Sequence, residues 1–198
     1  MRRLPTGGVL FVVCAAPLAW LAWGVIANSL GPDPVQVVMQ GTGVWALRFL
    51  LLTLCITPLR RWFGRPAIIR HRRQLGLWMF SYATLHLALF AQAYVGWSAP
   101  LLWEELAERP YITVGFAAWA LLLPLALTSS RGAQRKLRRR WLQLHRLIYP
   151  ALVFACLHLW WQVRSDAGEA LFYSAVALLL LGLRLYWRIN ERKRARAA

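Results

Sequence analysis

The sequence predicts an all-α integral membrane protein, a bundle of six transmembrane helices with both termini in the cytoplasm. Three observations lead to this fold class. Of 198 residues, 59% are hydrophobic and only 16% are charged, which is too few charges to cover a soluble domain of this size. Six separate segments are apolar over the length that a membrane helix needs. The charges fall in short clusters between these segments, alternately basic and acidic.

Six segments approach the about 20 apolar residues of a spanning helix. They are residues 9–27, 44–59, 75–97, 111–127, 142–163 and 170–187. The first follows MRR, and we interpret it as a retained helix because its apolar run is too long for a signal peptide and contains bulky tryptophans. The second is short and carries Arg48. Together the segments form a single domain over residues 1–198, with no evident internal repeat.

The prolines indicate where helices can bend, and the charges indicate which side of the membrane each loop faces. Pro17, Pro124 and Pro150 lie inside segments, where membrane helices tolerate them as kinks. The basic clusters contain Arg2, Arg3, Arg60, Arg61, Arg65, Arg70, Arg72, Arg73, Arg131, Arg135, Lys136, Arg138, Arg139, Arg140, Arg188, Arg192, Lys193, Arg194 and Arg196. The alternate loops hold Asp33, Glu104, Glu105, Glu108, Asp166 and Glu169. The positive-inside rule therefore places both termini in the cytoplasm. No nucleic-acid-binding motif accompanies the net charge of +17.

Three of the four histidines lie inside predicted spans, where an ionisable side chain indicates function. His86 is in the third segment, His145 and His158 are in the fifth, and His71 lies in the basic loop RHRR. A single buried histidine is readily satisfied by a neighbouring helix, but three on two helices favour ligation. Neutral imidazole suits haem iron, copper and zinc.

The spacing of the histidines limits what they can bind together. His145 and His158 are 13 positions apart, roughly 20 Å along a helix, so they cannot bind one metal ion. They fit two haems near opposite membrane faces, or one haem and a second function. His86 and His158 lie at similar depth and could flank one haem. An ideal helix would set His145 and His158 roughly 140° apart, and Pro150 between them allows a kink or a local change of winding.

Several stretches resemble one family in order and spacing. They are GTGVWALRFLLLTLCITPL, IRHRRQLGLWMFSYATLHL, RPYITVGFAAWALLLPLALTS, and QRKLRRRWLQLHRLIY followed by CLHLWW. Over most of its length the chain resembles the MsrQ (formerly YedZ) family, the haem-binding membrane subunits of bacterial MsrPQ methionine sulfoxide reductase systems. The wider relatives are the ferric reductase and NADPH oxidase membrane domains.

This resemblance implies a multi-pass protein of the bacterial inner membrane with a ferric reductase-like bundle. It implies one or two haems b, with His86, His145 and His158 as ligands of the haem iron. It also implies FMN, with Arg72 and Arg73 at the position linked to flavin binding or electron uptake. Electrons would come from the quinone pool or a cytosolic flavin reductase. They would pass to a periplasmic MsrP-type molybdopterin reductase that repairs oxidised periplasmic proteins.

The chain departs from the oxidase relatives in two ways. Their third helix carries two histidines, one for each haem, whereas Arg72 and Arg73 stand 14 and 13 residues before His86 here. An inner haem therefore lacks an obvious second ligand. The oxidases also have a cytosolic flavin and nicotinamide domain, and this sequence has no GxGxxG signature. Quinol or a separate reductase is therefore the expected electron donor.

The densest acidic group predicts a docking surface for the electron acceptor. Glu104, Glu105 and Glu108 lie in the loop SAPLLWEELAERP on the predicted outer face, and a solvated loop is the competing interpretation. No catalytic residues are predicted, since no Ser/His/Asp set and no paired carboxylates lie in a span. Alternatives to the reductase subunit are a cytochrome b-type quinol oxidase subunit, a ferric reductase with another acceptor, a metal transporter or assembly factor, and a plain membrane anchor.

Overall fold

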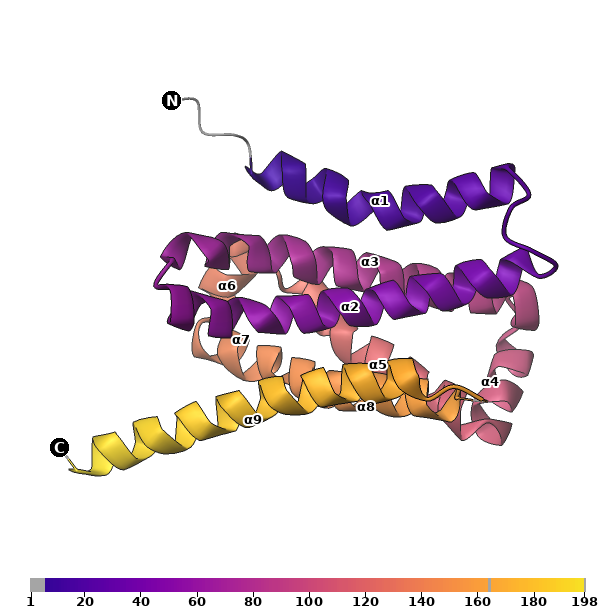
Figure 1. The fold of residues 1–198 in the computed structure, drawn as a ribbon. Coiled ribbons are helices and arrows are strands. Elements are labelled where there is room, and N and C mark those ends of the chain that lie inside the picture. The colour runs from indigo at the N-terminus through magenta and orange to yellow at the C-terminus, as the bar shows by residue number, and fades with distance from the viewer. Residues whose placement is uncertain (1–5, 164, 198) are drawn as a thin grey trace.

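The computed structural model describes residues 6–163 and 165–197, and the regular structure in these ranges is helical (Figure 1). Arg2 and Arg3 of the predicted basic clusters lie outside the described residues. The long helices are α1 (Thr6–Ile26), α2 (Pro34–Phe63), α3 (Arg72–Phe90), α5 (Pro110–Leu127), α8 (Ile148–Trp161) and α9 (Gly168–Ala197). The short elements are η1 (Pro66–His71), η2 (Ala91–Val95), α4 (Ala99–Glu108), α6 (Arg131–Leu137), α7 (Arg139–Leu144) and η3 (His145–Leu147).

Five stretches of helix are long and apolar enough to cross a membrane: α1, α2, α5, the run from Arg139 to Trp161, and α9. The third predicted span corresponds to α3 and the π-helical η2, and it is not among these five. Figure 1 shows α3 lying alongside α2, as a sixth helix of the bundle. The prediction of an all-helical membrane bundle is therefore confirmed, and the count of six spans stays a prediction.

The second predicted span proves much longer than its apolar run. α2 begins at Pro34, where the carboxylate of Asp33 caps the helix by accepting a hydrogen bond from the Gln36 amide at 2.9 Å. It ends at Gly64, whose φ of 61° is the left-handed conformation that suits glycine. Polar residues in the first turns hid this extension. One of them, Thr42, is fully buried and donates its hydroxyl to the Val38 carbonyl.

Arg48 is accommodated in the middle of α2 by partners on α9. Its guanidinium donates to the Tyr173 hydroxyl at 2.7 Å and lies 3.6 Å from the Glu169 carboxylate. The same group lies over the Trp45 ring, 4.6 Å from its centre. Hydrogen bonds, an opposite charge and an aromatic face together offset the cost of an arginine in an apolar helix.

The fifth predicted span is interrupted where proline predicts it. α7 and α8 are joined by the 3-10 turn η3 at His145–Leu147, directly before the first turn of α8, which contains Pro150. Proline has no N–H to bond the carbonyl four residues earlier, so the winding changes there. The sequence prediction of a local change of winding is confirmed.

Helix α1 is attached to α3 through a kink of its own. Pro17 loosens α1, and the Tyr82 hydroxyl of α3 inserts into the helical ladder beside it. This hydroxyl accepts from the Leu18 amide at 3.0 Å and donates to the Cys14 carbonyl at 2.9 Å. Tyr82 is only 1% exposed, so one buried group both satisfies α1 and fixes it against α3.

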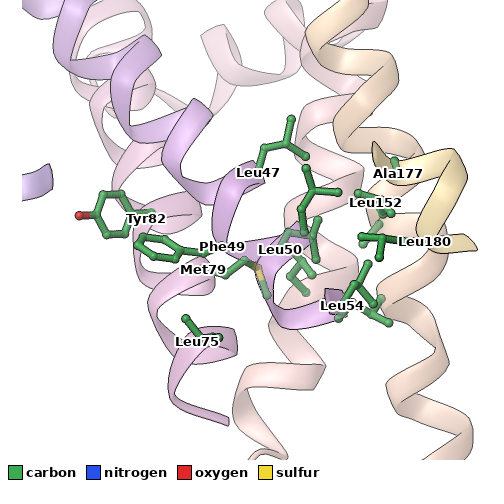
Figure 2. Packing of buried hydrophobic residues seen from close by; sticks show 14 of the residues in the cluster. Leu47, Phe49, Leu50, Leu54, Leu75, Met79, Tyr82, Leu152, Ala177 and Leu180 are labelled. Atoms are coloured by element: carbon green, nitrogen blue, oxygen red, sulfur yellow. The ribbon is translucent and has the colours of Figure 1, made fainter. Parts of the chain in front are cut away.

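Helix α2 is the centre of the core. Half of its apolar window is buried, compared with 17–22% in the other four candidate spans. Figure 2 shows its leucines and Phe49 reaching α3 on one side and α8 and α9 on the other. The labelled cluster comprises Leu47, Phe49, Leu50, Leu54, Leu75, Met79, Tyr82, Leu152, Ala177 and Leu180. The outer helices instead expose large apolar side chains, as expected of lipid-facing surfaces.

The two ends of the bundle differ in charge. The basic end contains the end of α2, the start of α3, η1, α6, α7 and the last turns of α9; the acidic end contains α4 and the start of α9 (Figure 1). α4 is a helix where the sequence suggested only a loop. The Ser98 hydroxyl caps it by accepting from the Leu101 amide, and a proline occupies its first turn.

Candidate functional site

His86 of α3 and His158 of α8 face each other inside the bundle, toward the acidic end. Their ring centres are 6.1 Å apart, and the ring planes make an angle of 76°. The sequence placed these two residues at similar depth, and the structure brings them together. His145 and His71 do not join them.

Backbone carbonyls orient both rings in the same way. Nδ1 of His86 lies 2.8 Å from the Met39 carbonyl oxygen of α2, and Nδ1 of His158 lies 2.7 Å from the Tyr111 carbonyl oxygen of α5. A carbonyl only accepts hydrogen bonds, so each neutral imidazole carries its proton on Nδ1. The lone pair is then on Nε2, which is the arrangement of a metal-ligating histidine held by a carbonyl.

Two glycines make room for the rings. A Cβ on Gly43 of α2 would stand 3.0 Å from His86 ring atoms, and a Cβ on Gly115 of α5 would stand 2.8 Å from the His158 ring. Neither glycine has a positive φ, so the requirement here is space and not backbone conformation. Each imidazole is thus seated against the bare backbone of a neighbouring helix.

These contacts reveal an internal repeat that the sequence analysis did not find. Each carbonyl lies 47 residues before its histidine, and a shift of 72 positions takes Met39 to Tyr111, Gly43 to Gly115 and His86 to His158. The hairpins α2–α3 and α5–α8 therefore contribute equivalent halves of one site. The sequence signal was present in the paired stretches YATLHL and FACLHL, each with a glycine 43 positions before its histidine.

The paired imidazoles fit a haem iron. A metal–imidazole bond is about 2 Å long, and the bonding nitrogen lies about 1 Å from the centre of its ring. Two imidazoles bound in line to one metal ion would therefore have ring centres about 6 Å apart. The observed separation matches this arrangement. Within the described residues, no three His, Cys, Asp or Glu side chains converge to hold a metal ion by themselves. A haem would bring its own ring nitrogens to the iron, so the two histidines would be the only protein ligands it needs.

His145 belongs to a separate group of side chains at the basic end. Its ring stacks on Trp141 with 4.0 Å between centres, and its Nε2 lies 3.2 Å from the Thr128 hydroxyl. That hydroxyl already donates to the Pro124 carbonyl, so it must accept from His145, whose proton is then on Nε2. His145 therefore has the opposite tautomer to the facing pair.

The adjacent arginines Arg72 and Arg73 point in different directions. Arg72 is half-buried at the start of α3. Arg73 is exposed and lines a cleft between α3 and α1. In the repeat, the position of Arg73 corresponds to that of His145.

The remaining predicted site residues lie apart from the histidine pair. Glu104 and Glu108 are exposed on α4, whereas Glu105 is half-buried and lies 3.2 Å from the Arg109 guanidinium. His71 accepts a hydrogen bond from Arg70 in η1. The acidic group is thus two exposed carboxylates and one that is already paired.

The fold and the site together indicate a helical membrane protein in which two facing histidines could bind a haem. The family described as "Ferric reductase like transmembrane component" matches residues 42–156, which include His86 and His145 and end just before His158. No solved structure matches this chain.

Curated relatives narrow the class. The chain is 48% identical over 174 residues to the "Protein-methionine-sulfoxide reductase heme-binding subunit MsrQ" of Xanthomonas euvesicatoria pv. vesicatoria, covering 88% of this chain and 80% of the relative. It is 47% identical over 184 residues to the protein of that name from Xanthomonas campestris pv. campestris strain B100, covering 90% and 84%. The chain belongs to the MsrQ family of the ferric reductase-like transmembrane proteins.

Proposed function

We propose that this protein is the haem-binding membrane subunit of a methionine sulfoxide reductase system and carries electrons across the membrane. The facing pair of His86 and His158 carries the proposal, because its separation suits two axial ligands on one iron. The names of the MsrQ relatives support the same cofactor and the same system. No CxxCH motif is present, so the haem is of the non-covalent b type.

The chain's own groups prepare this site. When bound, haem b supplies a one-electron couple of the iron. His86 and His158 would hold the iron through Nε2, and the carbonyls of Met39 and Tyr111 fix the tautomers that leave this nitrogen free to bind. Both imidazoles are only partly exposed, and limited access of water helps set the potential of a bound haem.

The charge pattern orients the transfer. By the positive-inside rule the basic end faces the cytoplasm, in an inner membrane crossed by six helices. Electrons then enter at the basic end, from quinol or a cytosolic flavin reductase. They leave at the acidic end to a periplasmic MsrP-type molybdopterin reductase, which repairs oxidised methionine in periplasmic proteins. The histidine pair lies toward the acidic end, on the delivery side.

Electron uptake at the basic end would use the group around His145. As a second iron ligand or as a tuning group, His145 would act together with Arg72 at the start of α3. An FMN, if this protein shares that cofactor with its family, would have its phosphate on Arg72 and Arg73 at this end.

The deciding experiment uses purified full-length protein. A reduced-minus-oxidised spectrum with haem quantified per chain should show b-type haem that acidic acetone extracts. Mixing the reduced protein with an MsrP-type reductase and methionine sulfoxide should oxidise the haem. Haem binding without oxidation by that partner would leave a haem protein with another acceptor.

A ferric reductase is the second candidate, favoured by the description of the matching family. Ferric chelate distinguishes the two functions. A ferric reductase would be oxidised rapidly by the chelate and slowly by the sulfoxide-reducing partner. A membrane without any haem spectrum would contradict both candidates and favour a metal transporter or an anchor.

A further inference from the structure

A cleft separates α1 from the start of α3 at the basic end. Its volume is about 470 Å³, within the about 300–1,000 Å³ of small-molecule pockets. Arg70, Arg73 and Gln74 line it at the basic end, and Ser81 lines it about 12 Å further along the rise of α3. The cleft therefore runs from the charged end of the bundle into the apolar part of the span.

The charged end of the cleft is held open by hydrogen bonds to α1. Arg70 donates to the Thr6 hydroxyl and Gln74 donates to the Gly7 carbonyl, each at 2.9 Å. Arg73 lies between these two tethers and is exposed. Within the described residues its guanidinium makes no hydrogen bond and no ion pair, so its donors are available to a ligand.

The deeper wall is apolar. Phe11 of α1 packs against Trp78 of α3 with 5.0 Å between ring centres, and Leu77 continues the same surface. Phe11 remains 56% exposed, so this wall is open toward the space that lipid tails occupy. A molecule that fills the cleft must therefore be polar at one end and hydrocarbon-like at the other.

Within the described residues, no carboxylate side chain pairs with these two arginines. Of the seven Asp and Glu residues in the whole sequence, six lie in the acidic clusters of the opposite loops. The seventh, Glu191, is paired with Arg61. An external anion is the remaining counterion for Arg73, and guanidinium binds phosphate through paired hydrogen bonds.

The lining also argues against quinol in this cleft. Quinol oxidation releases protons as well as electrons, so its site needs a base, and no carboxylate or imidazole lines the cleft. The imidazole of His71, next to Arg70 in η1, already accepts a hydrogen bond from Arg70. Two cations with an apolar wall suit an anion with a hydrocarbon tail better than a neutral ring.

We propose that this cleft binds an anionic phospholipid. Its phosphate would sit on Arg70 and Arg73, and its first acyl carbons would lie along Leu77 and Trp78. Basic pockets between transmembrane helices are suited to anionic headgroups. A lipid bound there also fills the gap between α1 and the rest of the bundle, and so stabilises the packing of the first helix.

The test is lipid binding measured by native mass spectrometry on the full-length, delipidated protein. Phosphatidylglycerol should bind more tightly than phosphatidylcholine. Arg73→Gln should weaken phosphatidylglycerol about 5-fold and Arg70→Gln with Arg73→Gln about 30-fold, since each basic residue near a membrane surface contributes a factor of this size. Arg73→Gln keeps both tethers to α1, so loss of lipid there cannot be attributed to a detached helix.

Matched controls remove the same charge elsewhere on the basic end. Arg131→Gln and Arg131→Gln with Arg135→Gln, on the exposed face of α6, should change phosphatidylglycerol binding less than about 3-fold. Equal losses in the cleft and control variants, or equal binding of the two lipids, would overturn the proposal. If inorganic phosphate, FMN or a water-soluble quinol binds in an Arg73-dependent way and phosphatidylglycerol does not, the cleft belongs to that ligand and the lipid site is wrong.

Discussion

The histidines at the two ends of the bundle have different surroundings. Toward the acidic end the repeat places His86 and His158 face to face, each seated on a glycine and oriented by a carbonyl. At the basic end the same repeat supplies His145 from one half and Arg73 from the other, and these point apart. Two equivalent hairpins thus build one symmetric histidine pair and one asymmetric group. We infer that the symmetric end holds the tightly bound haem, and that the asymmetric end has another task or a weaker site.

The largest effect should follow from removing a ligand of the symmetric seat. His86→Ala or His158→Ala should abolish most of the bound haem, because a single axial histidine leaves the iron without its second protein bond. Haem per chain, measured after purification, checks this. His71→Ala is the control and should retain haem. Wild-type spectra in both ligand variants would show that the facing pair is not the site.

Substitutions of Gly43 and Gly115 test whether the two halves of the repeat support the two imidazoles in the same way. Gly43→Ala and Gly115→Ala should each lower haem retention about tenfold, because a Cβ at 3.0 or 2.8 Å must displace the ring, and overpacking typically costs about 1–3 kcal/mol. The remaining haem should have an altered low-spin EPR signal, since this signal depends on the angle between the imidazole planes. Gly182→Ala and Gly8→Ala, where an added Cβ meets nothing within 4 Å, are matched controls. Identical spectra in all four variants would contradict the seating role.

The asymmetric end is tested by His145→Ala. We expect haem at the facing pair to remain, while a second haem is lost or the rate of haem reduction by the donor falls several-fold. Haem per chain and stopped-flow reduction are measured together. Thr128→Val should lower haem content and the reduction rate less, since it removes the hydrogen bond to His145 but keeps the imidazole. Unchanged haem content together with an unchanged reduction rate would leave His145 a structural residue.

The sequence predicted the features of this site that depend on apolar runs and helix length, and it missed those that depend on contacts between distant residues. Helices α1, α5 and α9 and the depth match of His86 and His158 follow from apolar runs and a rise of about 1.5 Å per residue. The start of α2 was predicted ten residues too late because its first turns are polar, and a cap at Asp33 mattered more than hydropathy. Composition is a poor guide where side chains face a cofactor site or another helix.

The glycine seats and the carbonyl partners are contacts between residues more than 40 positions apart. Hydropathy does not show such contacts, because a glycine in a membrane helix has several possible roles. The repeat would have predicted them, since two histidines with glycines at the same spacing are a strong pattern. Successive residues of a helix are about 100° apart around its axis, so the side chains of Arg72 and Arg73 point in different directions. The sequence analysis treated the two arginines as one pair and did not take this rotation into account.

Exchanging the arginines for lysine sharpens the comparison at the asymmetric end. Arg72→Lys with Arg73→Lys retains charge and insertion but removes the guanidinium fork. We expect flavin binding or the rate of haem reduction to fall about 3- to 10-fold, and the two single variants to show which guanidinium is responsible. Flavin content and reduction rate provide the measurement. Full activity in the double variant would exclude an uptake role for this pair.

The smallest effect concerns delivery from the symmetric end. Reversing Glu104, Glu105 and Glu108 to lysine should slow oxidation of the reduced haem by the periplasmic partner several-fold at low salt, and leave the haem spectrum unchanged. Complementary surface charge mainly raises the association rate, and salt screens it over a Debye length of about 8 Å at physiological ionic strength. Glu105 already pairs with Arg109, so Glu104→Lys with Glu108→Lys should reproduce most of the effect. Stopped-flow oxidation across a salt series separates docking from a solvated helix. Equal rates for the variant and the original protein at low salt would remove α4 from the docking surface.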